Sequence, residues 1–330
     1  MSDFWPGFTA LCEKAEVSDF FIESEQPLKY LRFGAMTIDP ELRVSKEVFL
    51  EVAQKIGLDL KRTNQDTGWG FGIARFRVNM FQTGGKHRVV LRMLPRHIPH
   101  PSQLRIPPQF LEFIRGLKQG LILFCGPTGS GKSTSNASLM EHIFLKERKI
   151  HLLTLEDPIE YALGATSEGC LVSQRQIGND VPSFAEGLYY GLRQAPQIIY
   201  VGEIRDMHTA EIALSAAETG HLILSTMHTS SCDQTVQRFL QMIPAERLTQ
   251  AQGALAAMLQ AVVCQRLLPK EDGKGRFAIH EVMLQTIPIR NYIEGGNWGR
   301  IPNELEIGRK FGHQTFKHSL ELAVQEGLIS

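Results

Sequence analysis

Apolar residues after about residue 120 fall into short runs, and amphipathic stretches separate these runs. The runs predict buried strands at Leu121–Cys125, Ile150–Leu155, Ile198–Val201 and His221–Thr226. Helical spacing predicts helices over Thr134–Lys146, from the capping box Ser183–Glu186 toward Pro196, and over Glu211–Glu218 before Gly220. Alternating strands and helices are typical of an α/β fold with a mostly parallel sheet, which we expect here.

One further segment of this region is rich in alanine and leucine. Ala245–Leu268 predicts a long helix, with a possible break near Gly253 and an end at Pro269. It would be the longest helix of the chain.

The first 94 residues show a different, mixed pattern. Helices are predicted over Phe8–Ala15 and Lys46–Ile56, and strands over Phe20–Ile22, Leu28–Phe33, Ala74–Phe81 and His87–Met93. The last two strands flank the turn Thr83-Gly84-Gly85, so we expect them to pair. Arg75, Arg77 and Asn79 alternate with apolar residues, which places these polar side chains on one face.

Prolines mark a boundary between the two patterns. Pro95, Pro99, Pro101, Pro107 and Pro108 lie close together in the sequence. A chain of 330 residues suggests two domains at ~150 residues each. We therefore expect an N-terminal domain at 1–94, a linker at 95–104 and a second domain at 105–330.

A phosphate-binding motif follows the first strand of the second domain. Gly126–Ser133 fits G-x-x-x-x-G-K-[ST], the P-loop, and a predicted strand and helix flank it as they should. Glycines let backbone N–H groups face an anion, and the helix dipole favours negative charge there. The expected nucleotide-binding residues are Gly126, Pro127, Thr128, Gly129, Ser130, Gly131, Lys132, Ser133 and Thr134. Lys132 would reach the phosphates and Ser133 would bind Mg²⁺.

Acids and histidines follow the other predicted strands. Glu160 closes the acidic segment Thr154–Glu160, and Glu203 follows the strand Ile198–Val201. A carboxylate at a buried strand end needs a cation or a donor. Mg²⁺ or a catalytic water would meet that need for Glu203, and so would Arg205. His221 and His228 flank the last strand, either as nucleotide contacts or as satisfied core residues.

Composition narrows the class of protein. The formal net charge is 0 and the pI is about 7.2, which argues against a nucleic-acid binder. The five cysteines contain no C-x-x-C pair, so we expect neither a zinc knuckle nor a disulfide framework. The sequence shows no apolar run near the ~20 residues of a membrane span and no signal peptide, which predicts a cytosolic protein.

These motifs resemble those of a known superfamily, the secretion and pilus ATPases. Gly126–Ser133, Thr154–Tyr161, Val201–Asp206 and Gly220–Thr229 are similar, in this order, to its Walker A, Asp box, Walker B and His box. The chain most resembles the type IV pilus retraction ATPases (PilT-like), over nearly its whole length. Ile289–Glu294 looks like the short C-terminal helix that the retraction subfamily needs.

The resemblance implies a PAS-like α/β N-terminal domain and a RecA-like P-loop ATPase domain that ends in a helical region. It implies ATP and Mg²⁺ as cofactors, with Glu203 as the leading catalytic carboxylate and a metal ligand, and Glu160 as a second candidate. His221 and His228 would sense or contact the nucleotide. Arg77 and Arg92 match arginines that the N-terminal domain supplies to the phosphates, and Arg75 is a weaker candidate.

The resemblance also implies partners. They are further copies of this chain in a homohexamer, an inner-membrane pilus platform protein and paralogous pilus ATPases. The expected location is the cytoplasm, at the periphery of the inner membrane.

Some features depart from the family pattern or discriminate within it. Phe21 stands where the family usually has His, and Arg193–Gln197 lacks the usual acids. Missing C-x-x-C pairs favour retraction over pilus assembly. The alternatives are an ATPase of a type IV secretion or conjugation system and a catalytically silent regulatory ring subunit.

Overall fold

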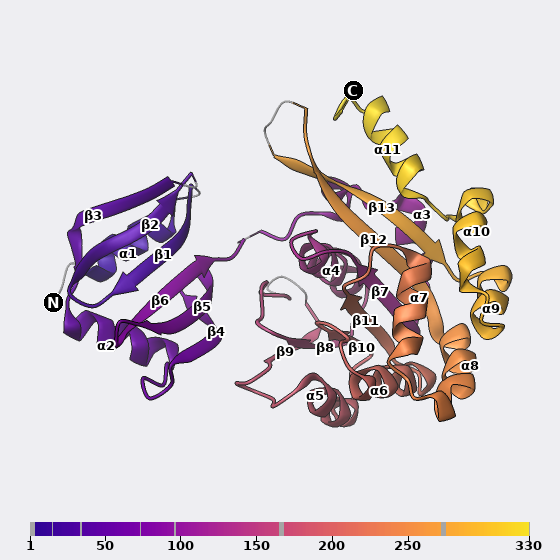
Figure 1. The fold of residues 1–330 in the computed structure, drawn as a ribbon, viewed down its shortest axis with the longest axis horizontal. Coiled ribbons are helices and arrows are strands. Elements are labelled where there is room, and N and C mark those ends of the chain that lie inside the picture. The colour runs from indigo at the N-terminus through magenta and orange to yellow at the C-terminus, as the bar shows by residue number, and fades with distance from the viewer. Residues whose placement is uncertain are drawn as a thin grey trace. The chain divides into compact units, whose positions relative to one another are not determined.

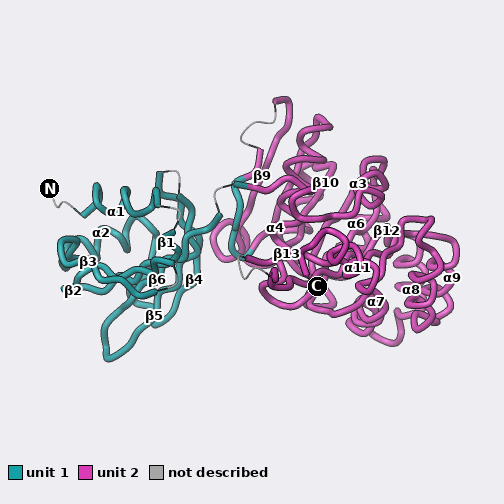
Figure 2. Tube along the Cα trace, turned by 90° about the horizontal axis from the view of Figure 1, so that it is seen from above, with its two compact units in different colours: residues 1–97, 157–162 teal, residues 98–156, 163–330 magenta. Residues whose placement is uncertain are grey.

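The computed structural model describes residues 4–14, 16–33, 35–72, 74–95, 97–164, 168–271 and 275–329. The chain forms two compact units (Figures 1 and 2). Unit 1 comprises Met1–His97 and Asp157–Ala162, and unit 2 comprises Ile98–Glu156 and Leu163–Ser330. The first boundary, between His97 and Ile98, falls inside the segment 95–104, whose role as a linker stays a prediction.

Unit 1 is an antiparallel sheet covered by two helices. The strand order is β3-β2-β1-β6-β5-β4. The strands are β1 Val17–Glu23, β2 Gln26–Arg32, β3 Ala35–Val44, β4 Asn64–Phe71, β5 Ala74–Thr83 and β6 Lys86–Met93, and the helices are α1 Phe4–Cys12 and α2 Lys46–Ile56. Phe8, Phe20 and Phe76 are fully buried in its core. Helix α2 begins where the Ser45 side chain accepts a hydrogen bond from the Val48 N–H, which confirms the predicted start.

Most predicted elements of unit 1 are present, and two strands were missed. The hairpin of β5 and β6 turns through Gly84 and Gly85, whose φ values are 57° and 74°. The predicted helix Phe8–Ala15 lies instead at Phe4–Cys12, and Ala15 is outside the described residues. Strand β3 is largely exposed, so it has too little apolar alternation to predict a strand.

Unit 2 contains a mostly parallel sheet, as expected. The strand order is β13-β12-β7-β11-β10-β8-β9, and only the β12–β13 pair is antiparallel. The strands are β7 Gly120–Cys125, β8 His151–Glu156, β9 Leu171–Gln176, β10 Ile198–Val201, β11 Leu222–Met227, β12 Leu259–Pro269 and β13 Arg276–Leu284. Strands β7, β10 and β11 are entirely buried, because helices cover both faces.

The helices of unit 2 divide between the two faces of this sheet (Figure 1). Helices α5 Phe184–Gly191, α6 Met207–Glu218, α7 Cys232–Gln241 and α8 Leu248–Met258 pack over one face. Helices α3 Pro108–Arg115 and α4 Lys132–Leu139 pack over the other, where Phe110 contacts Phe124 of β7. Helix α4 continues as a π-helical turn, Met140–Leu145. The chain ends in α9 Ile287–Glu294, α10 Ile301–Ile307 and α11 Phe316–Gln325.

The predicted long helix over Ala245–Leu268 is wrong in its second half. A short turn, Ala245–Arg247, leads into α8, which ends at Met258, and the chain then continues as strand β12. Strand β12 pairs with β7 on one side and β13 on the other. Val262 and Val263 suit a pleated strand, and tertiary pairing overrides the helix propensity of the neighbouring alanines.

No helix within the described residues is long and apolar enough to cross a lipid bilayer.

Candidate functional site

The P-loop connects β7 to α4, so it lies at the carboxyl end of the central strand. Gly126 and Gly131 have φ values of 145° and 88°, a backbone conformation that residues other than glycine rarely adopt. A Cβ on Gly126 would lie 2.4 Å from the Gln265 carbonyl oxygen, so only glycine fits there. Helix α4 begins after Gly131 with no side-chain cap. The dipole of this uncapped helix N-terminus favours negative charge.

Lys132 places its charge inside this loop. Its Nζ donates to the carbonyl oxygens of Gly126 at 2.7 Å and Pro127 at 3.0 Å, and the residue is buried. Ser130 Oγ is buried and has no hydrogen-bond partner among the described residues. A buried ammonium, an unsatisfied hydroxyl and uncapped N–H groups together suit a phosphate group.

Gln265 of β12 supports the loop from beneath, and the sequence analysis missed it. Its Nε2 donates to the Ser130 carbonyl oxygen at 2.6 Å, and its Oε1 accepts from Ser135 Oγ at 2.7 Å. His280 Nε2 lies 3.2 Å from the same Oε1. The role of Gln265 was not foreseen because the segment Ala245–Leu268 was predicted to be helical. A polar residue inside an apolar strand pattern was the available signal.

Glu203 follows β10, so it lies at the carboxyl end of this inner strand of the sheet. The Ile204 N–H donates to the Thr226 carbonyl oxygen at 3.0 Å, and Thr226 Oγ1 donates to the Gly202 carbonyl oxygen at 2.6 Å. A Cβ at Gly202 would lie 3.1 Å from the Leu155 carbonyl oxygen. This crowding explains glycine at the position where a common Walker B strand carries Asp.

Two basic side chains face the Glu203 carboxylate. Arg205 Nε lies 2.5 Å from Glu203 Oε2, and His228 Nε2 lies 3.5 Å from the same oxygen. Arg205 therefore neutralises the Glu203 carboxylate in this structure. The sequence analysis offered this ion pair as the alternative to Mg²⁺ or a catalytic water. Its side chain is 70% exposed, whereas that of Glu203 is 12% exposed. An exposed ion pair of this kind opens at little cost.

His228 links Glu203 to the P-loop. Burial lowers the pKa of His228, and the nearby Lys132 ammonium lowers it further, whereas the Glu203 carboxylate opposes this shift. The imidazole is therefore neutral at pH 7. The structure thus brings together Lys132, His228 and Glu203 at the carboxyl ends of β7, β11 and β10.

The structure does not bring His221 to this group. The His221 carbonyl oxygen accepts a hydrogen bond from the Gly120 N–H, at the start of β7, and its ring Nδ1 lies 3.1 Å from the Ala216 carbonyl oxygen. The P-loop follows the other end of β7. Strand β11 therefore separates the two histidines by about 20 Å, at ~3.3 Å per residue. The expectation that His221 senses or contacts the nucleotide stays a prediction.

The acidic segment after β8 divides between the two units. Glu156, at the end of β8, is buried and accepts hydrogen bonds from Thr154 Oγ1 at 2.6 Å and Gln174 Nε2 at 2.9 Å. Glu160 lies in Asp157–Ala162, which belongs to unit 1. Its role as a second catalytic carboxylate stays a prediction.

Arg77 and Arg92 lie side by side on the exposed face of the unit 1 sheet. They are direct partners across β5 and β6. Arg92 Nε donates to Asp19 Oδ1 at 2.8 Å. No hydrogen bond or ion pair of the Arg77 side chain is found among the described residues. Arg75 instead donates to the Ile159 carbonyl oxygen at 3.0 Å. Two adjacent guanidinium groups repel each other unless an anion lies between them.

The family model for type II/IV secretion system proteins matches residues 12–328. The chain belongs to this family. It is 40% identical over 260 residues to the type IV pilus retraction ATPase PilT of Pseudomonas aeruginosa, which covers 78% of this chain and 74% of PilT. It is also 39% identical over 258 residues to a twitching motility protein of Neisseria gonorrhoeae, covering 78% of this chain and 68% of that protein.

A solved structure gives the same assignment. The crystal structure of the pilus retraction motor PilT with bound ADP superposes with a TM-score of 0.86 at 34% identity, covering 98% of this chain and 93% of that one. The chain is thus a PilT-like ATPase with the N-terminal sheet domain and ATPase domain of that group.

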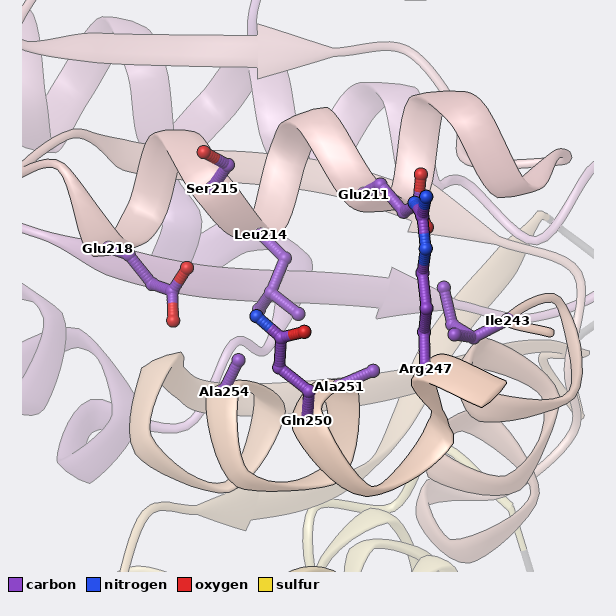
Figure 3. Close-up of a pocket in the computed structure, with 9 residues that line it drawn as sticks. All are labelled: Glu211, Leu214, Ser215, Glu218, Ile243, Arg247, Gln250, Ala251 and Ala254. Carbon is purple, nitrogen blue, oxygen red and sulfur yellow. The ribbon is translucent and has the colours of Figure 1, made fainter. Parts of the chain in front are cut away.

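A second, separate hollow lies between α6 and α8 of this ATPase domain (Figure 3). This pocket of about 300 Å³ is lined by Glu211, Leu214, Ser215, Glu218, Ile243, Arg247, Gln250, Ala251 and Ala254. Arg247 Nη1 lies 2.9 Å from Glu211 Oε1 at its edge. Its lining contains two carboxylates and no glycine loop, so it does not suit a nucleotide phosphate.

Proposed function

We propose that this chain is an ATP-hydrolysing motor that powers type IV pilus retraction. The observation that carries the proposal is the grouping of Lys132, His228 and Glu203 beside a P-loop that leads into the uncapped N-terminus of α4. The chain's likeness to PilT, over most of both proteins, supports pilus retraction as the purpose of that chemistry.

In this proposal the P-loop residues Gly126–Thr134 bind the phosphates of ATP. Lys132 turns its ammonium from the loop carbonyl oxygens toward the β- and γ-phosphates. Ser133 and Glu203 would hold Mg²⁺, which would supply positive charge to neutralise the phosphates. Arg205 releases Glu203 when the nucleotide enters, and Glu203 then orients the attacking water and accepts its proton. Neutral His228 donates a hydrogen bond to the γ-phosphate.

The unit 1 arginines complete the phosphate site. Arg77 and Arg92 come from the N-terminal domain. Asp19 already pairs with Arg92, whereas the exposed Arg77 beside it has no ion pair among the described residues, which suits a phosphate anion. An arginine that stabilises the transition state of phosphoryl transfer is worth on the order of 10³–10⁵ in rate. Glu160 is kept as a second candidate base.

The motor acts as a homohexamer at the cytoplasmic side of the inner membrane. Its partners are a membrane-embedded pilus platform protein and paralogous pilus ATPases. ATP turnover moves the ATPase domain against an N-terminal domain about the 95–104 segment, and this motion drives pilin back into the membrane.

Steady-state phosphate release from the purified protein tests the enzyme part of the proposal. Wild type should hydrolyse ATP in the presence of Mg²⁺, and Lys132→Ala should lose at least about 10²-fold in rate, because a preorganised cation at the developing charge is removed. Lys118→Ala, an exposed lysine before β7, is the matched control and should retain wild-type turnover. Absence of turnover in wild type would instead indicate a silent regulatory ring subunit.

A further inference from the structure

Three cysteines cluster in the core directly behind the P-loop. Cys125 is the last residue of β7, Cys264 is its register partner on β12, and Cys232 is the first residue of α7. All three are fully buried. The three cysteines are far apart in the sequence, so no motif of closely spaced cysteines predicts that they meet.

The sulfur atoms lie at a distance that suits a shared metal ion. Cys232 Sγ is 3.9 Å from Cys264 Sγ. Two thiolates bound to one tetrahedral zinc ion at about 2.3 Å have sulfurs about 3.8 Å apart. A disulfide instead needs a sulfur separation of about 2.05 Å. To form a disulfide, the sulfurs of Cys232 and Cys264 would have to move about 2 Å closer within a close-packed core.

A carboxylate faces the same two sulfurs. Glu281 of β13 offers an oxygen, and the donor atoms of Cys232, Cys264 and Glu281 all lie within 4.8 Å of one another. Glu281 Oε1 accepts a hydrogen bond from the Cys232 N–H at 2.8 Å, at the start of α7. This bond fixes the carboxylate beside the thiols. Glu281 is half-buried, so its carboxylate loses part of its solvation, which a bound cation would offset.

We propose that Cys232, Cys264 and Glu281 form a structural binding site for Zn²⁺. Cys125 is the register partner of Cys264 on β7, but it lies outside this group of donor atoms. Two thiols and a carboxylate are a donor set that zinc accepts in tetrahedral sites. Binding exchanges the two thiol protons for the metal, and these protons leave to solvent.

The position of the site gives it a structural consequence. It joins the start of α7 to β12 and β13, and it stands one residue before Gln265, whose side chain supports Ser130. A metal there fixes the strand that carries the P-loop support. Both thiols are fully buried and Glu281 is half-buried, so we expect the ion to bind the thiols during folding.

The metal content of the intact protein tests this proposal. The protein is expressed in zinc-supplemented medium, purified without chelator and analysed by inductively coupled plasma mass spectrometry. We expect about one zinc ion per chain in wild type. After unfolding and refolding with Co²⁺ as the only metal, we expect thiolate-to-cobalt charge transfer and the intense visible bands of tetrahedral cobalt. Wild type with less than about one-tenth of an ion per chain and no cobalt bands would overturn the proposal.

Variants locate the metal. Cys232→Ser and Cys264→Ser should each lose most of the zinc, and Glu281→Gln should weaken Zn²⁺ binding by at least about tenfold while it retains an acceptor for the Cys232 N–H. Cys170→Ser is the matched control, because Cys170 is half-buried elsewhere and donates to the carbonyl oxygens of Leu145 and Arg148. Unchanged zinc content in soluble Cys264→Ser or Cys232→Ser protein would place the ion elsewhere and overturn the assignment. The wild-type measurement decides the proposal even if these variants fail to fold.

Discussion

The side-chain amide of Gln265 donates a hydrogen bond of 2.6 Å to the backbone carbonyl oxygen of Ser130. Gln265 lies on β12, and Ser130 lies in the P-loop, so the two residues are far apart in the sequence. The same amide group also accepts from Ser135 of α4. The conformation of the phosphate loop therefore depends on a neighbouring strand as well as on the loop's own glycines.

The first prediction concerns this support. Gln265→Ala should weaken ATP binding by about 10–100-fold, because it leaves the buried Ser130 carbonyl and Ser135 hydroxyl without partners, at about 1–3 kcal/mol. The measurement is the dissociation constant of a fluorescent ATP analogue. Gln260→Ala, near the other end of the same strand, is the control and should bind the analogue as wild type does. Equal affinities in both variants would show that the loop holds its shape without Gln265.

The sequence predicted the structure well where the hydrophobic pattern of a segment and a local motif agree. Strand β10 was predicted at its actual bounds, and the P-loop lies between a strand and a helix as its motif requires. Failures came where tertiary contacts decide. The alanines before Val262 predicted a helix, yet pairing with β7 makes this segment a strand. Strand β11 places His221 and His228 at its opposite ends, and the role of His221 stays a prediction.

Glu203→Gln separates nucleotide binding from hydrolysis. The amide has nearly the same shape but accepts a proton poorly, so turnover should fall by at least about 10²-fold, while ATP binding without Mg²⁺, which depends on the P-loop, changes little. Phosphate release and analogue binding are measured on the same preparation. Glu211→Gln, which removes a carboxylate in ion pair with Arg247 on α6, serves as the control. Wild-type turnover in Glu203→Gln would transfer the role of base to another group, with Glu160 tested next.

Arg77→Gln should lower activity and raise stability at the same time. Removing one of two facing guanidinium groups relieves like-charge repulsion on the sheet, which we expect to stabilise unit 1 by about 0.2–1 kcal/mol. If Arg77 contacts phosphate, turnover falls by at least about 10³-fold in the same variant. Arg88→Gln is the control on this sheet, because Arg88 is paired with Glu23. A stabilised variant with normal turnover would leave Arg77 with no part in the chemistry.

Acid should destabilise unit 2 through its buried histidines. Burial, with a further contribution from the Arg105 charge, lowers the pKa of His280 to about 3, and burial lowers the pKa of His313 to about 4. Between these values and about 6.5, the unfolded chain binds protons that the native chain excludes. The free energy of unfolding therefore falls as pH drops below about 6.5. His280 alone contributes on the order of 5 kcal/mol, for a shift from 6.5 to about 3 at about 1.4 kcal/mol per pKa unit.

Urea unfolding between pH 7 and pH 4 measures this dependence. His280→Gln should flatten the curve over that range, because one of the buried groups no longer titrates. A wild-type curve that is flat from pH 7 to pH 4, or a variant curve of the same slope, would contradict the assignment.

The number of pili on the cell surface tests the central claim most directly. It is counted by electron microscopy in a strain that carries Lys132→Ala, beside strains with wild type and Lys118→Ala. A retraction motor without its phosphate clamp should leave the cells with excess, immobile pili, whereas Lys118→Ala cells should resemble wild type. Bald cells would show that the motor builds pili, and an unchanged pilus number would point to a secretion system; either result would contradict retraction.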